Sequence, residues 1–305
     1  MFRVLITDGM EETALQQLRQ LGFEVTEQSV PAGELGAVMS QYDALLVRSA
    51  TKVRSCHIEE ARGSRLKLIL RCGVGVDNID VAAAEAAGIA VRNTPKAASE
   101  SVAELALGHL LSCCRSISAA GHTMREDKWE KKAYAGGIEL WGKTLGIIGF
   151  GRIGQALGRI AKALGMTVLA YDLYPDPTLE AEMAMHYVPL EELLARSDFL
   201  SVHAPAADGQ PLVRAETIAQ MKDGVVIVNT SRGSNVKEDD LLEALNSGKV
   251  RAAGLDVYAA EPSPNHDLYS HPHVSCTPHI GAQTAEAQAR VGAEAVEVMK
   301  AFFGL

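Results

Sequence analysis

The stretch that most constrains the fold runs from Lys143 to Asp172. An apolar run over residues 143–149 has the length of a buried strand, and glycines stand at positions 149, 151 and 154. Apolar spacing then predicts a helix over residues 152–164, and a second apolar strand over residues 166–171 ends at Asp172. Strand, glycine turn, helix, strand and acid follow in the order that a dinucleotide-binding site of the Rossmann type requires.

Each glycine of this turn has its own physical role. Gly149 permits the tight turn, Gly151 lets the backbone approach a pyrophosphate, and Gly154 lets the helix pack closely on the strand. The helix N-terminus then offers unpaired N–H groups and a partial positive charge to the phosphates. Asp172 stands 18 residues beyond the last glycine, where a carboxylate accepts from the ribose hydroxyls and repels a 2′-phosphate. We therefore expect NAD(H) rather than NADP(H) as cofactor.

The composition is that of an ordinary globular chain, large enough for about two domains. Its 305 residues are 47% hydrophobic and 22% charged, and the formal net charge is −9. No long basic run interrupts that acidic balance, which argues against nucleic-acid binding. An anionic substrate remains compatible with it, because such a substrate needs only a locally positive pocket.

Several features favour the cytoplasm. The five cysteines are odd in number and form no C-x-x-C motif, so we expect free thiols in a reducing compartment. The N-terminal run reaches an acid, Asp8, too early for a signal peptide. The most apolar stretch, residues 102–114, is interrupted by Glu104 and His109, so we expect no membrane span and no membrane partner.

Apolar runs alternate with amphipathic stretches along the chain, which predicts parallel sheets with helices on both faces. The strands expected in the first sheet are residues 3–7, 23–27, 44–47, 66–70 and 89–91. Those expected in the second are residues 143–149, 166–171, 198–202, 225–229 and 252–256. The predicted class is therefore α/β, with two doubly wound parallel-sheet domains.

The domain division follows from one hinge and one returning helix. Pro95 and small residues precede a long helix predicted over residues 99–118, and a final amphipathic helix is predicted over residues 286–303. We expect this last helix to pack on the first domain. A discontinuous, flavodoxin-like substrate domain is thus predicted over residues 1–96 and 285–305, and a Rossmann NAD-binding domain over residues 97–284.

Three polar loops follow predicted strands of the second sheet, at the strand ends where open α/β sheets bind ligands. Arg232, Glu261 and His279 lie one in each loop. Oxidising an alcohol with NAD needs a base for the hydroxyl proton, and histidine titrates near neutrality. A neighbouring glutamate favours the imidazolium, and the planar fork of an arginine can grip a carboxylate or carbonyl oxygen. We expect the three side chains to converge over one nicotinamide.

Taken together, the motifs resemble those of the D-isomer-specific 2-hydroxyacid dehydrogenase family over nearly the whole chain. They lie at residues 46–53, 73–80, 101–111, 142–154, 231–233 and 278–282. Among its branches the chain most resembles the D-3-phosphoglycerate dehydrogenases. That resemblance implies the conversion of 3-phosphoglycerate to 3-phosphohydroxypyruvate, the first step of serine biosynthesis. The chain departs from the usual family pattern at residues 234–237 and at Val74.

The resemblance also implies roles for individual residues, with Arg232, Glu261 and His279 as the catalytic set. Together with the glycine fingerprint, it predicts that NAD meets Gly149, Gly151, Arg152, Ile153, Gly154, Asp172, Thr230, Asp256, Gly281 and Ala282. The residues it predicts to hold the substrate are Arg48, Ser49, Gly73, Val74, Gly75, Arg232 and His279.

Two other functions remain open at this stage. One is a reductase for glyoxylate, hydroxypyruvate or another 2-oxo acid, and the other is a non-catalytic NAD-sensing protein like the transcriptional corepressors of the family. We expect no metal, because the run of histidines over residues 266–273 has no fixed ligand spacing and hydride transfer needs none.

We also expect a homodimer formed through the NAD-binding domain. The predicted contact surface is the helix over residues 99–118 and the segment over residues 119–141. Trp129, Tyr134 and Trp141 lie in that segment, and aromatic residues are enriched at interfaces. Lys131 and Lys132 from the same segment would then add positive charge to the partner's substrate site.

Overall fold

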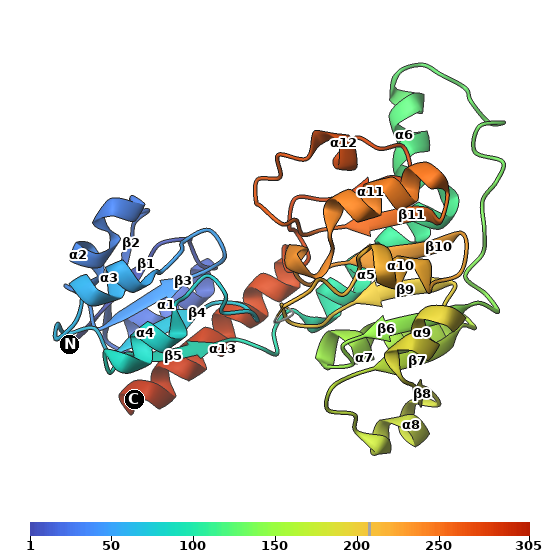
Figure 1. Cartoon of the computed structure of the whole chain (residues 1–305). Helices are drawn as coiled ribbons and strands as arrows, with labels where there is room; N and C mark the ends of the chain where they lie inside the picture. Colours follow the sequence, from blue (N-terminus) through green and yellow to red (C-terminus); the bar gives the residue numbers. More distant parts are fainter. Residues whose placement is uncertain (207–208) are drawn as a thin grey trace. The chain divides into compact units, whose positions relative to one another are not determined.

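The computed structural model describes residues 1–206 and 209–305, which form two compact units (Figure 1). Unit 1 comprises Met1–Ser99 and Ala282–Leu305, and unit 2 comprises Glu100–Gly281. Each unit contains one parallel sheet with helices on both faces, which confirms the predicted α/β class with two parallel sheets. Among the described residues, no helix has the length and apolar character needed to cross a membrane.

Unit 1 is built on a five-stranded sheet in the order β2-β1-β3-β4-β5, the flavodoxin-like arrangement. The strands are β1 (Phe2–Ile6), β2 (Phe23–Glu27), β3 (Ala44–Val47), β4 (Leu68–Arg71) and β5 (Ala90–Asn93). Helices α1 (Glu12–Gln20) and α13 (Ala285–Phe303) cover one face of the sheet. The other face is covered by α2 (Leu35–Met39), α3 (Ser55–Glu60) and α4 (Val81–Ala86), with the short η1 (Ala32–Glu34) before α2.

Helix α13 is the last element of the chain and packs within unit 1. Gly292 on this helix lies so close to α1 that an added Cβ would stand 2.7 Å from Cβ of Ala14. At the far end of the helix, the ring centroid of Phe303 lies 4.4 Å from that of Phe2 on β1. The small residue and the aromatic contact together fix the chain's end against the sheet that begins it.

Unit 2 contains a seven-stranded sheet in the order β12-β11-β10-β9-β6-β7-β8. Counted from β6, this is the 3-2-1-4-5-6 order of dinucleotide-binding folds, with β12 added at one edge. The strands are β6 (Thr144–Ile148), β7 (Thr167–Tyr171), β8 (His186–Tyr187), β9 (Phe199–Val202), β10 (Val225–Asn229), β11 (Val250–Leu255) and β12 (Val274–Cys276). Because these strands are parallel, their C-terminal ends lie on the same side of the sheet. The loops that follow β6, β7, β10, β11 and β12 are therefore neighbours there.

The helices of unit 2 divide between the two faces of its sheet (Figure 1). One face is covered by α5 (Ser99–Arg115), α7 (Arg152–Ala163) and α8 (Pro177–Met183). The opposite face is covered by α9 (Leu190–Arg196), α10 (Ala215–Ala219), α11 (Glu238–Ser247) and α12 (His266–Tyr269). A 3-10 turn, η2 (Gly233–Asn235), follows β10.

The single helix predicted over residues 99–118 is wrong at its C-terminal end. Helix α5 ends at Arg115, Ser116 takes a left-handed φ of 54°, and α6 (Ile117–Arg125) starts a new helix. At this end the carbonyl of Cys114 accepts from the amide of Ile138 (3.0 Å), and the amide of Ser118, which would pair with that carbonyl in a continuous helix, donates to Ser112 Oγ (3.4 Å) instead. Residues 126–141 then run along the outside of unit 2 (Figure 1).

Candidate active site

The glycine turn after β6 has the geometry of a phosphate cradle. Gly149 has a φ of 88°, and a Cβ there would lie 2.6 Å from the amide nitrogen of Ala204. A Cβ on Gly154 would overlap the carbonyl oxygen of Gly149, so α7 starts in close contact with the turn. In the described structure, nothing lies within 4 Å of where a Gly151 Cβ would stand. The turn thus leaves room at the N-terminus of α7, and a pyrophosphate fits there.

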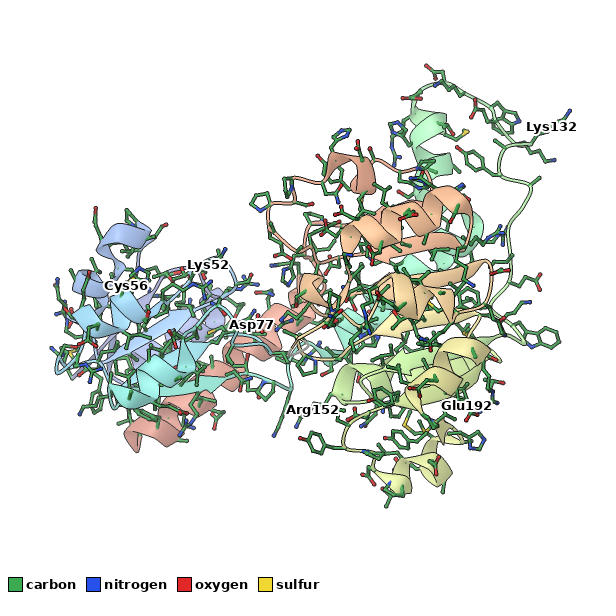
Figure 2. All side chains as sticks on the ribbon, in the orientation of Figure 1. Lys52, Cys56, Asp77, Lys132, Arg152 and Glu192 are labelled. Carbon is green, nitrogen blue, oxygen red and sulfur yellow. The ribbon has the colours of Figure 1, made fainter. Side chains whose placement is uncertain are left out.

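Asp172 stands just beyond β7, where the same turn fixes its carboxylate. Its Oδ2 accepts from the amide of Phe150 (2.7 Å), and its Oδ1 accepts from the amide of Tyr174 (2.9 Å). Carboxylate oxygens have further lone pairs, so acceptors remain for ribose hydroxyls. Arg152, the first residue of α7, is exposed (Figure 2), and Ile153 is half-buried. The donor and acceptor set therefore fits a dinucleotide.

The three predicted catalytic residues come together within unit 2. His279 Nδ1 lies 2.7 Å from Glu261 Oε2, and the two side chains are 36% and 38% exposed. Partial burial disfavours the charge of Glu261, but the hydrogen bond and charge of His279, aided by Arg232, hold the pKa of Glu261 below its ordinary value. Glu261 is therefore an ionised acceptor that orients the imidazole and directs Nε2 away from itself.

Close packing of two loops brings Arg232 toward Glu261. The next residue, Gly233, lies so near the loop after β11 that a Cβ there would overlap the backbone of Tyr258. The amide of Tyr258 in turn donates to Glu261 Oε1 (3.3 Å). Glycine at position 233 is therefore a steric condition for the approach of the two loops.

The departure from the family pattern at residues 234–237 is well packed. Asn235 is fully buried, and its Nδ2 lies 3.0–3.1 Å from the carbonyl oxygens of residues 204–205 and from Ser231 Oγ. The Ser231 hydroxyl donates to Asn229 Oδ1 (2.8 Å), and Asn229 Nδ2 donates to the carbonyl of Arg232 (2.8 Å). This network supports the arginine loop, and no pattern in the sequence pointed to Asn235 as part of it.

His279 adopts a left-handed backbone conformation with a φ of 56°, which is unfavourable for a residue with a Cβ. The next two amides hold it there, because Ile280 and Gly281 each donate to a carboxylate oxygen of Asp256 at 2.8 Å. Asp256 is 1% exposed and also accepts from the hydroxyl of Thr277 (2.6 Å). Besides its predicted contact with NAD, Asp256 therefore fixes the loop that carries the histidine.

The remaining residues predicted to meet NAD are less defined. Thr230 is buried directly after β10, with Oγ1 3.5 Å from His203 Nδ1. The carbonyl of Ala282 accepts from the side chain of Gln288 (2.6 Å). For both residues, contact with the cofactor stays a prediction.

In unit 1, the loop after β3 that carries Arg48 and Ser49 is fixed by two polar side chains. Asp8 Oδ2 accepts from the amides of Arg48 (2.7 Å) and Thr51 (3.1 Å). Asn78 Nδ2 lies 2.8 Å from the carbonyl oxygen of Arg48 and 2.7 Å from that of Thr51. Sequence reasoning did not assign either supporting residue to the site, although an acid directly after a strand is a signal for Asp8.

The turn after β4 offers fewer donors than predicted for a substrate. Gly73 has a φ of 152°, and its amide already donates to the carbonyl of Arg71 (2.9 Å). Val74 is 38% exposed and Gly75 is half-buried. Contact of the substrate with Gly73, Val74 and Gly75 stays a prediction.

Comparison with known proteins places this geometry in a family. Residues 107–281 match the model described as D-isomer specific 2-hydroxyacid dehydrogenase, NAD binding domain. The chain belongs to the D-isomer-specific 2-hydroxyacid dehydrogenases. It is therefore an NAD-dependent oxidoreductase that acts on the CH–OH group of its donor, which confirms the predicted family, enzyme class and cofactor.

Individual relatives differ in their substrates. The chain is 48% identical over 301 residues to a hydroxypyruvate reductase of Thermotoga maritima, covering 97% of this chain and 96% of the relative. It is 42% identical to a D-3-phosphoglycerate dehydrogenase of Methanocaldococcus jannaschii, covering 98% of this chain but 57% of that relative. The chain thus spans little more than half the length of that dehydrogenase. A crystal structure of D-lactate dehydrogenase from Aquifex aeolicus, complexed with NAD and lactic acid, has a TM-score of 0.86 at 30% identity, covering 99% of this chain and 95% of that one.

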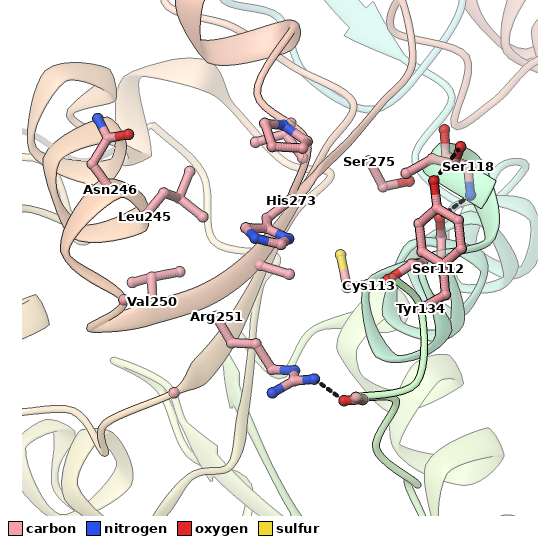
Figure 3. Close-up of a pocket in the computed structure, with 18 of the residues that line it drawn as sticks. Ser112, Cys113, Ser118, Tyr134, Leu245, Asn246, Val250, Arg251, His273 and Ser275 are labelled. Atoms are coloured by element: carbon pink, nitrogen blue, oxygen red, sulfur yellow. Dashed lines mark hydrogen bonds between the residues drawn. The ribbon is translucent and has the colours of Figure 1, made fainter. Parts of the chain in front are cut away.

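Two of the hollows in the described part of unit 2 lie beside predicted sites. One, of about 430 Å³, opens beside the Glu261–His279 pair and is lined also by Tyr258, Tyr269 and Cys276. The other, of about 510 Å³, lies between the end of α5, residues 133–136 and strands β11 and β12 (Figure 3). There the guanidinium of Arg251 donates to the carbonyl of Gly136. This second hollow borders the segment predicted to form the dimer contact.

Proposed function

We propose that the chain interconverts a small 2-oxo acid and the corresponding D-2-hydroxy acid, with hydroxypyruvate as its preferred 2-oxo acid. The observation that carries the proposal is the contact of 2.7 Å between His279 and Glu261, next to the charge of Arg232. The substrate preference rests on the Thermotoga maritima hydroxypyruvate reductase, which matches this chain along almost its whole length.

In the proposed reduction, each catalytic side chain has one task. NAD, in its reduced form, supplies the hydride. Protonated His279 hydrogen-bonds the substrate carbonyl oxygen through Nε2 and gives that oxygen its proton. Arg232 pairs with the substrate carboxylate or carbonyl oxygen through its planar fork, and Glu261 stabilises the imidazolium until the proton has left. In the oxidation direction His279 takes the hydroxyl proton instead.

The binding residues are also part of the proposal. NAD would bind to the glycine turn, Asp172 and the loop of Asp256, and the substrate would contact Arg48, Ser49 and the backbone of residues 73–75. The rigid support of the Arg48 loop by Asp8 favours such a positioning role.

A second candidate substrate is 3-phosphoglycerate, which is favoured by relatives such as the Methanocaldococcus jannaschii enzyme. Its phosphate needs cations besides those for the carboxylate. Arg48 is one, and Lys131 and Lys132 are the others. Lys132 and Arg152 lie on opposite sides of unit 2 (Figure 2), so the lysine pair is remote from the cofactor site of its own chain. On this proposal the pair acts on the partner chain of a homodimer.

The homodimer itself is proposed to form through α5, α6 and the segment after them. Trp129 is 80% exposed, Trp141 is 75% exposed, and Ile117 and Met124 are more than half exposed. Large apolar side chains gathered on one segment are typical of an interface. Light scattering at micromolar concentration tests it, and a monomer there would refute it.

A substrate panel tests the proposed function. NADH oxidation is measured with hydroxypyruvate, glyoxylate, pyruvate and phosphohydroxypyruvate, and we expect the highest kcat/KM with hydroxypyruvate. Preference for the phosphorylated acid would support the second candidate instead. In that case Arg48→Ala should raise KM for phosphohydroxypyruvate ~10–150-fold more than for glyoxylate, since one charge-assisted contact contributes ~1.5–3 kcal/mol. NADH binding without turnover of any acid would favour the NAD-sensing alternative.

A further inference from the structure

A buried histidine that the proposed chemistry does not use lies behind the catalytic loop. His109 is 2% exposed on α5, between Ala106 and Leu110, which are fully buried in the apolar core. Gly254 on β11 makes room for it, because a Cβ there would stand 2.5 Å from Cβ of His109. A polar ring therefore occupies a core position that an apolar side chain could fill, and Gly254 provides the space for it.

Both ring nitrogens of His109 have hydroxyl partners on the strand and loop that lead to His279. Nδ1 lies 3.0 Å from Ser275 Oγ, and Nε2 lies 3.0 Å from Thr277 Oγ1. The hydroxyl of Thr277 is in turn 2.6 Å from Oδ1 of Asp256. A continuous series of hydrogen bonds therefore runs from Ser275 to the carboxylate that holds the catalytic loop.

The direction of every bond in this series can be deduced. The Thr277 hydroxyl donates its one proton to Asp256 Oδ1, so Oγ1 must accept from His109 Nε2–H. Burial lowers the pKa of His109, although the charge of Asp256 opposes this, so the ring is neutral near pH 7. A neutral ring protonated on Nε2 has an acceptor at Nδ1, and the hydroxyl of Ser275 donates to it. All three bonds then point toward Asp256, an arrangement in which each strengthens the next.

We propose that His109 is a positioning residue for His279, acting through Thr277 and Asp256. The directed series fixes the carboxylate of Asp256, and that carboxylate binds the amides of Ile280 and Gly281. Those two amides keep His279 in its left-handed backbone conformation, which sets the place of the imidazole. The consequence for turnover rests on the proposed function, whereas the effect on the loop does not.

Three substitutions at one position separate this role from simple packing. His109→Leu fills the core and removes both hydrogen bonds, His109→Asn retains an amide near the Nδ1 position, and His109→Gln places a donor near the Nε2 position. We expect His109→Leu and His109→Asn to speed hydrogen exchange of the Ile280 and Gly281 amides by at least ~10-fold, measured by NMR. The same two variants should lower kcat ~10-fold with little change in KM for NADH, and His109→Gln should restore most of both.

Two further variants keep the test decisive. Leu110→Ala leaves a cavity in the same core and should lower the melting temperature without changing exchange at Ile280 and Gly281. Ser275→Ala removes only the donor to Nδ1 with little change in volume, so it should raise the exchange rate of the Ile280 and Gly281 amides. It tests the proposal even if His109→Leu does not fold. The proposal is overturned if the exchange is unchanged in His109→Leu or Ser275→Ala, if His109→Gln restores nothing, or if Leu110→Ala has the same effect. A wild-type protein inactive on every 2-oxo acid would refute the proposed function, while the exchange experiment would still decide the role of His109.

Discussion

Replacing Glu261 with glutamine tests the proposed acid–base pair most directly. The change keeps the size of the side chain and removes the charge that faces His279 at 2.7 Å. Charges about 4 Å apart attract by ~1 kcal/mol in water and ~4 kcal/mol at an effective dielectric constant of 20. Because both side chains are more than a third exposed, the lower half of that range applies, about 1–2 kcal/mol. This corresponds to a change of roughly one pH unit.

The assay is the pH profile of NADH oxidation with hydroxypyruvate. Reduction requires the imidazolium, so activity fails as the pH rises and the proton leaves His279. The pKa of Glu261 is held below its ordinary value, so the wild-type carboxylate stays ionised throughout this limb. Without it the imidazolium is less stable, and we expect Glu261→Gln to lose activity about one pH unit lower than wild type. Glu297→Gln, on the exposed side of α13, is the matched control for a lost surface charge. An unmoved profile in Glu261→Gln would refute the pairing.

Three further predictions concern the cofactor, the loops and the thiols. Asp172→Ala should weaken the binding of NADH by about tenfold or more, since charge-assisted hydrogen bonds contribute about 1.5–3 kcal/mol. It should also reduce the preference for NADH over NADPH, and a wild-type preference for NADPH in steady-state assays would contradict this. Gly233→Ala places a Cβ on the backbone of Tyr258, so kcat and the melting temperature should both fall, and a variant normal in both would contradict the close packing. Burial raises the pKa of the Cys72 thiol to about 12, so at pH 8 iodoacetamide should label the exposed Cys56 and spare Cys72 in the native protein, as read by mass spectrometry; equal labelling would contradict it.

Much of the architecture could be predicted from the sequence because it rests on local rules. The residues from 143 to 172 combine apolar runs, three glycines and an acid, and in the structure Gly149 and Gly154 make the tight turn and the close packing that the spacing indicated. The end of α5 could not be predicted in this way, because apolar spacing continues past Arg115, whereas the carbonyl of Cys114 accepts a tertiary hydrogen bond from the amide of Ile138. Contacts between residues distant in sequence do not show in the hydrophobic periodicity from which helices and strands are predicted.

The supporting polar residues were missed for the same reason. Asp8 and Asn78 hold the loop of Arg48 from 40 and 30 residues away, and His109 reaches Thr277 across 168 residues. A lone histidine in an apolar helix, judged by sequence alone, is most often a residue satisfied within the core. What distinguishes His109 is that one of its two hydroxyl partners, Thr277, donates to the carboxylate of Asp256.

The conformation of His279 shows why such partners are needed where they are. A left-handed φ of 56° is natural for glycine, yet a glycine at this position would remove the imidazole that the proposed chemistry requires. The chain therefore carries an unfavourable backbone state of order 1–3 kcal/mol at the residue proposed to move the proton. Two amides bound to one buried carboxylate offset it, and a carboxylate that buried must itself be fully hydrogen-bonded. The strained backbone of His279 thus needs the two hydrogen bonds to Asp256, and the buried carboxylate of Asp256 needs the hydroxyl of Thr277 as a donor. That hydroxyl oxygen in turn needs a donor, which the polar ring at position 109 provides.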